Sequence, residues 1–94
     1  MASYLSYSVM LDTLKKVQAL QEDILLSGHS AHLDAGVHQN LPDTQNTHIS
    51  FELTIFRGNG IVNTFDFNAC GSEEVLNATY DLAVAYTKYL KANV

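Results

Sequence analysis

Apolar residues recur every three or four positions through residues 4–26 and again through residues 72–91, which is the spacing of amphipathic helices. Between these segments, residues 48–57 and 61–69 alternate apolar and polar side chains, as half-buried strands do. The glycine-rich residues 58–60 join the two alternating segments and favour an antiparallel hairpin. The chain from residue 1 to 94 is therefore predicted to form a single α+β domain in the order α-β-β-α.

Polar residues and glycine mark the expected ends of the two helices. Ser3 or Ser6 is in position to cap the start of the first helix, and Gly28 follows its last apolar residue. Ser72 is expected to cap the second helix, which carries glutamates in its first turn and lysines in its last.

The apolar face of the hairpin decides how its strands pair. A two-residue turn at Asn59–Gly60 would place Leu53 opposite Asp66 and spoil that face. A three-residue loop, Gly58–Asn59–Gly60, keeps the face continuous and leaves Gly60 in the left-handed conformation of a G1 bulge. We therefore predict the three-residue loop, which pairs Leu53 with Phe65, Phe51 with Phe67, and Ile49 with Ala69.

More apolar surface lies along both helices than one hairpin can cover. In the first helix it spans roughly 200° of the circumference, about twice what a small sheet needs. The hairpin also has two open edges without proline or lysine. A homodimer would cover the excess apolar surface and the open edges, by joining two hairpins into a four-stranded sheet or by packing helices together. The residues expected at such an interface are Tyr4, Leu11, Leu20, Leu25, Phe56 and Tyr80.

Residues 28–46 show no clear periodicity and are predicted to form a long loop, either mobile or ordered. This loop holds three of the four histidines of the chain. Zinc sites need three or four nitrogen, sulfur or oxygen ligands, and the loop offers a candidate set in His29, His32, Asp34 and His38. The alternative is a solvated polar loop without a metal, because no pair of these ligands lies on a firm helix.

The predicted register brings a second group of reactive side chains together. His48 would lie opposite Cys70, just before the second helix, where the helix dipole favours a thiolate. This is the outline of a thiol–imidazole pair. On the same face Glu52 would lie opposite Asp66, and two carboxylates so placed repel each other or attract a cation. The alternative is a solvated sheet face with an inert cysteine.

Composition and charge indicate which kinds of partner and which location to expect for this chain. The net charge is −5 and the five basic residues form no run, which argues against binding of nucleic acid or of an anionic membrane surface. No apolar stretch is long enough to span a bilayer, and the first residues lack the basic region of a signal peptide. With a single cysteine, no internal disulfide is possible, and we expect a cytoplasmic location.

These observations favour binding over catalysis. We expect a small acidic interaction module that forms a homodimer, contacts a further protein partner and uses no cofactor. One alternative is a small enzyme that depends on a metal held by the loop histidines or on Cys70 with His48. The other is a structural subunit of a larger assembly.

Overall fold

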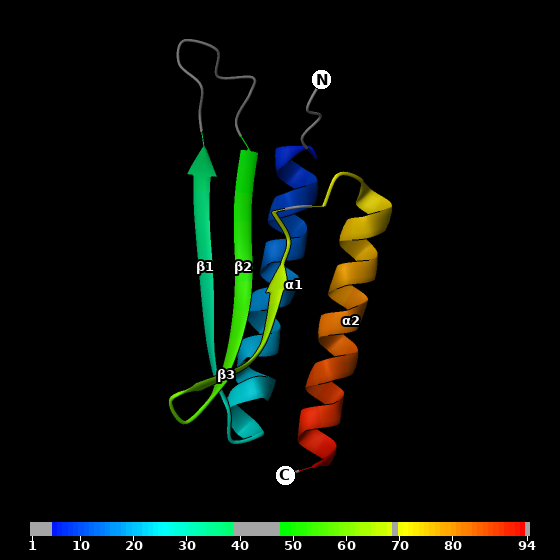
Figure 1. Cartoon of the computed structure of the whole chain (residues 1–94). Helices are drawn as coiled ribbons and strands as arrows, with labels where there is room; N and C mark the ends of the chain where they lie inside the picture. Colours follow the sequence, from blue (N-terminus) through cyan, green and yellow to red (C-terminus); the bar gives the residue numbers. More distant parts are fainter. Residues whose placement is uncertain (1–4, 39–47, 69, 94) are drawn as a thin grey trace.

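The computed structural model of the protein describes residues 5–38, 48–68 and 70–93. It contains an antiparallel sheet of three strands and a layer of two helices packed on one face of that sheet (Figure 1). The elements in chain order are α1 (Tyr7–Leu26), β1 (Ser30–His38), β2 (His48–Arg57), β3 (Gly60–Asp66) and α2 (Glu73–Ala92). The α+β class is confirmed, and the order is α-β-β-β-α, with one more strand than predicted.

The additional strand, β1, lies within the segment that was predicted to be a loop. Residues 30–38 pair with β2 along their whole length, from Ser30 opposite Phe56 to His38 opposite His48. The loop prediction over 28–46 is therefore wrong for this stretch, while residues 39–47 lie outside the described residues. The alternation in β1 is weak because two of its apolar positions, Ala31 and Ala35, are alanines, and Gly36 carries no side chain.

The register of the β2–β3 hairpin is confirmed, but its turn is not the predicted one. Leu53 lies opposite Phe65, as the apolar face requires. The turn itself has only two residues, Gly58 and Asn59, since Arg57 pairs with Gly60. The bulge lies further along β3, where one residue is inserted between the partners of Ile55 and Phe56. That insertion shifts the pairing by one and restores the predicted register.

The left-handed glycine is Gly58, with φ of 62°, and not Gly60. The predicted pairing of Phe51 with Phe67 continues beyond the end of β3, because the Phe67 N–H donates to the Phe51 carbonyl oxygen at 3.1 Å. The predicted pairing of Ile49 with Ala69 involves a residue that lies outside the described ones.

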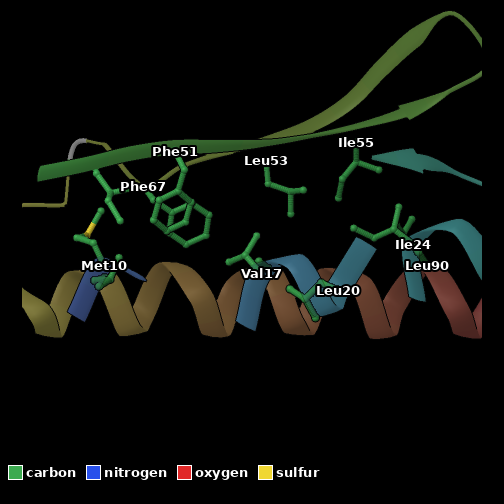
Figure 2. Close-up of a cluster of buried hydrophobic side chains, with 12 residues drawn as sticks. Met10, Val17, Leu20, Ile24, Phe51, Leu53, Ile55, Phe67 and Leu90 are labelled. Carbon is green, nitrogen blue, oxygen red and sulfur yellow. The ribbon is translucent and has the colours of Figure 1, made fainter. Parts of the chain in front are cut away.

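The hydrophobic core fills the space between the sheet and the helices (Figure 2). Every apolar residue that points from β2 toward the helices is buried, and these are Ile49, Phe51, Leu53 and Ile55. α1 contributes Met10, Val17, Leu20 and Ile24, and α2 contributes Leu76, Ala83 and Leu90. α1 lies across β1 and β2, and α2 lies beside α1 on the β3 side (Figure 1).

The helix ends carry the expected caps. Ser6 accepts a hydrogen bond from the Val9 N–H at 3.3 Å, and Ser72 accepts one from the Val75 N–H at 3.2 Å. At the other end of α1, Gly28 has φ of 84°, a left-handed conformation that suits glycine just after a helix. These short-range contacts confirm the predicted ends of the two helices to within a few residues.

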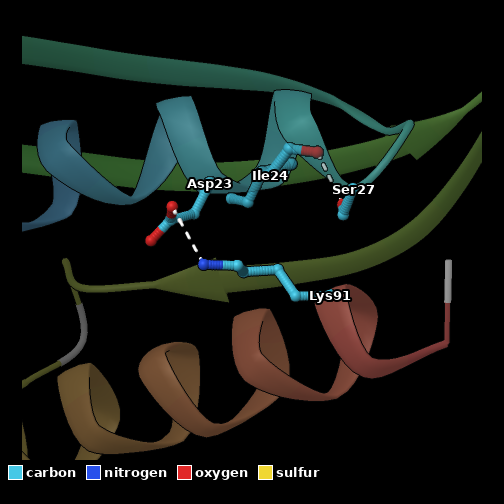
Figure 3. Close-up of polar contacts among 4 residues, drawn as sticks. All are labelled: Asp23, Ile24, Ser27 and Lys91. Carbon is cyan, nitrogen blue, oxygen red and sulfur yellow. Dashed lines mark hydrogen bonds and ion pairs between the residues drawn. The ribbon is translucent and has the colours of Figure 1, made fainter.

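Two polar contacts lie close to the end of α1 (Figure 3). The Ser27 hydroxyl donates to the Ile24 carbonyl oxygen at 2.6 Å, and the Lys91 ammonium lies 3.3 Å from an Asp23 carboxylate oxygen. The second contact joins residues 68 positions apart and ties the last turns of α1 and α2 together. Neither α1 nor α2 is long and apolar enough to cross a membrane.

Candidate interaction surface

The residues of the predicted metal site are spread over two parts of the fold. His29 lies between α1 and β1, and its Nδ1 is 3.1 Å from the Ser27 hydroxyl oxygen. His32 and Asp34 lie two residues apart on β1, both exposed. The described residues contain no group of three or more histidine, cysteine or acidic side chains that could hold a metal ion. The His38 side chain lies outside the described residues.

Cys70 is half-buried against the core, between β3 and α2. Its Sγ lies 3.6 Å from the Thr79 hydroxyl oxygen of α2, and that hydroxyl donates to the Val75 carbonyl oxygen at 2.8 Å. The thiol is thus placed beside the first turns of α2. Its pairing with His48 stays a prediction, because the His48 side chain lies outside the described residues.

A row of carboxylates crosses the face of the sheet that the helices leave open. Glu52 lies opposite Asp66, as predicted, and also opposite Asp34 on the other side. A shallow depression of about 230 Å³ adjoins this row and is lined by Asp34, Ala35, Gly36, Ser50, Glu52 and Asn68. Neighbouring carboxylates favour a positively charged group nearby, but the row alone does not define a ligand. Asp34 was not predicted as the third member of this row, because β1 lies in the segment that was predicted to be a loop.

The described residues among those predicted for a dimer interface differ in their exposure. Leu20 is buried in the core, and Leu11 is half-buried and packs against it. Tyr80 is half-buried, with the Lys16 ammonium 5.7 Å from its ring centroid. Phe56 is half-buried opposite Ile61, and Leu25 is exposed in the last turn of α1. Tyr4 lies outside the described residues.

A continuous apolar row follows α2 on the side that faces away from the core. Its large members are 50% exposed at Val75, 65% at Leu82 and 63% at Tyr89. Exposed alanines lie between and after them, so the complete row, here called the outer row of α2, consists of Val75, Ala78, Leu82, Ala85, Tyr89 and Ala92. At ~100° per residue, its centre lies roughly 140° from the centre of the buried face of the helix.

The outer row was partly visible in the sequence. The apolar stripe of residues 72–91 is wider than one contact requires, and the structure divides it into a buried face and the outer row. Tyr89, which the stripe predicts to be core, is exposed. Tyr86 is half-buried, and its ring makes an edge-to-face contact with Phe65 of β3 at 5.8 Å between centroids. Spacing alone could not tell the two faces apart.

The edge of β3 lies on the same side of the molecule as α2. With the strand order β1-β2-β3, both β1 and β3 have one edge that no strand of the described chain pairs with. Neither strand carries the lysine or proline that natural edges use to prevent association. In Figure 1, no other described element packs against the far side of α2. The side of the molecule formed by α2 and the free edge of β3 is therefore the surface best suited to contact a partner.

Comparison of the chain with protein-family models, with curated proteins and with solved structures finds no match.

Proposed function

We propose that this protein is an interaction module that works as a homodimer and that the outer row of α2 makes the contact. The observation that carries the proposal is the exposure of Val75, Leu82 and Tyr89 in one line along a helix. Single exposed apolar residues are ordinary, but a contiguous apolar patch on a small domain usually marks an interaction site. Tyrosine at its end suits such a contact, because the ring is apolar and the hydroxyl tolerates water.

A second copy of the chain is the partner that the surface supports best. A helix that presents one apolar row can bury it against the same row of another copy around a two-fold axis, and such symmetric dimers are the commonest oligomers. Packing at α2 also leaves the open face of the sheet accessible. The net charge of −5 and the carboxylates on that face support a basic surface on any further partner. The single cysteine supports a cytoplasmic location for the dimer.

The mass in solution tests this proposal. Sedimentation equilibrium from micromolar to millimolar chain concentration should show a mass that rises from 10.4 kDa to twice that value. A mass that stays at one chain over the whole range would overturn the homodimer. A mass that grows beyond two chains would favour the alternative of a subunit in a larger assembly.

A further inference from the structure

We propose, resting on the homodimer proposed above, that two copies pair through the outer rows of α2 in antiparallel orientation. In this pair Leu82 of each copy packs on Ala85 of the other, and Asp81 of each copy faces Lys88 of the other. The spacing of the outer row, the sizes of its side chains and the charges beside it support this arrangement independently.

The spacing of the outer row is that of a coiled-coil seam. Its members follow one another at intervals of three and four residues from Val75 to Ala92. Such a repeat keeps an apolar seam facing a partner helix along its whole length. At 1.5 Å per residue the row is about 26 Å long, which is nearly the full length of α2. Because the row points away from the core, a partner helix that packs on it contacts neither the sheet nor α1 of the chain that presents the row.

The sizes of the side chains favour the antiparallel pair. Residues at one heptad position are large and those at the other are all alanine. Antiparallel packing places each large residue against an alanine of the partner, and the pairs, each formed twice by symmetry, are Val75 on Ala92, Leu82 on Ala85, and Tyr89 on Ala78. Parallel packing would instead place large on large and alanine on alanine. That arrangement alternates crowding with gaps, whereas protein contacts are close-packed.

The charges beside the row also favour the antiparallel pair. Asp81 and Lys88 each immediately precede a large residue of the row, so they lie on the same flank of α2, and both are exposed. Antiparallel pairing brings the Asp81 carboxylate of one copy to the Lys88 ammonium of the other, twice by symmetry. In a parallel pair Asp81 would lie near Tyr86, which is neutral. Exposed ion pairs stabilise little, but they select the orientation and partner.

The extent of the contact sets the expected affinity. The area buried between one pair of 20-residue helices is at or below the lower end of the ~1,200–2,000 Å² that stable protein interfaces bury. We therefore expect dissociation constants on the order of micromolar, a range in which the effect of single charges is measurable.

Charge reversal tests the pairing. Asp81→Lys places like charges together at both symmetric contacts, and so does Lys88→Asp, so each variant should dimerise about tenfold more weakly at low salt. When the two variants are mixed, each reversed charge meets an opposite one, and a heterodimer of wild-type strength or better should form. Matched controls reverse exposed charges on α1, by Asp12→Lys and Lys15→Asp, and should leave the dissociation constant unchanged. Circular dichroism of all four variants verifies that the fold is intact.

Disulfide trapping tests the orientation in a second way. In a Cys70→Ser background, Ala78→Cys and Tyr89→Cys proteins should cross-link to each other when mixed, and neither should cross-link to itself. Self-cross-linking of the Ala78→Cys protein would indicate parallel helices and overturn the inference. Equal dissociation constants for wild type and charge variants would also overturn it, while the homodimer stands. A wild type that stays monomeric removes the homodimer itself and the pairing with it.

Discussion

The rings of Phe51 and Phe67 stack with 4.7 Å between their centroids and 18° between their planes. Both side chains are fully buried, and Phe67 follows the last residue of β3. The contact therefore extends the pairing of β2 and β3 past the regular ladder and fixes the chain just before it enters α2. It places the first turn of α2 against the end of the sheet where Met10 of α1 also packs (Figure 2).

Loss of the Phe67 ring should destabilise the whole domain. Phe67→Ala removes a buried aromatic side chain and leaves a cavity, which typically costs about 3–5 kcal/mol of unfolding free energy. Phe65→Ala is the matched control, because Phe65 lies two residues away and is only half-buried, so its loss should cost clearly less. Urea denaturation followed by circular dichroism measures both. Equal losses for the two variants would contradict the placement of Phe67 in the core.

The hairpin turn provides a test that separates the observed turn from the predicted one. Gly58 has a left-handed backbone, so Gly58→Ala should cost about 1–2 kcal/mol of unfolding free energy. At Gly60 a new Cβ meets only the Arg57 carbonyl oxygen, at an ordinary contact distance of 3.8 Å, and Gly60→Ala should change stability little. The three-residue loop predicted from sequence would reverse this order. Thermal unfolding of the two variants decides between the turns.

The two helices, the central strand and the pairing of Leu53 with Phe65 could be predicted from the sequence, because each follows from strong local periodicity. The position of the bulge was not accessible. A three-residue loop and a two-residue turn followed by an inserted residue in β3 give the same register further along the strands. Strand β1 was missed because alanines and Gly36 blur its alternation, and its pairing with β2 is a tertiary contact.

The carboxylate row on the sheet and the exposed row on α2 were harder to predict than the fold. The carboxylates of Glu52 and Asp66 followed from the hairpin register, whereas Asp34 joins them only through β1. The apolar stripe of residues 72–91 includes both core and surface positions, and helical spacing gives no sign of which side meets the sheet. Tyr89 belongs to this stripe and is exposed, whereas Leu20, which was predicted to lie at an interface, is buried in the core. The positions of neighbouring elements decide such assignments.

The ion pair between Asp23 and Lys91 should contribute little to stability. The side chains of both residues are about half exposed, and pairs of this kind typically stabilise a protein by less than about 1 kcal/mol. Asp23→Asn should therefore lower the unfolding free energy only slightly, and the difference from wild type should vanish in high salt. Urea denaturation at two salt concentrations provides the measurement. A large loss that persists in salt would show that the contact has a greater role in joining α1 and α2.

Replacement of Cys70 should leave the fold and the dimer intact. The thiol is half-buried beside Thr79 on α2, a residue that is not a member of the outer row, and serine is close to it in size. Cys70→Ser should therefore keep the melting temperature within a few degrees and the dissociation constant within about twofold. The folded wild type should also react with an alkylating reagent more slowly than the urea-unfolded chain. Rapid alkylation of the folded protein would instead support the thiol-dependent alternative.

Leu82 and Leu25 allow the outer row to be tested against the interface first predicted from sequence. They are 65% and 68% exposed, on α2 and α1 respectively, so a charge at either position should change the unfolding free energy of one chain little. Leu82→Glu places a charge in the centre of the proposed seam and should weaken dimerisation at least tenfold. Leu25→Glu introduces the same charge at equal exposure outside the seam and should have no effect on dimerisation.

Sedimentation equilibrium of the Leu82→Glu and Leu25→Glu proteins gives the dissociation constants that this comparison needs. Loss of dimer only in Leu82→Glu assigns the contact to α2, since exposure and introduced charge are matched. Loss only in Leu25→Glu would place the contact at the end of α1, where the periodicity of residues 4–26 predicted it. Equal weakening in both would indicate that overall charge and not a local contact controls association, because each variant adds one negative charge to a chain whose net charge is already −5.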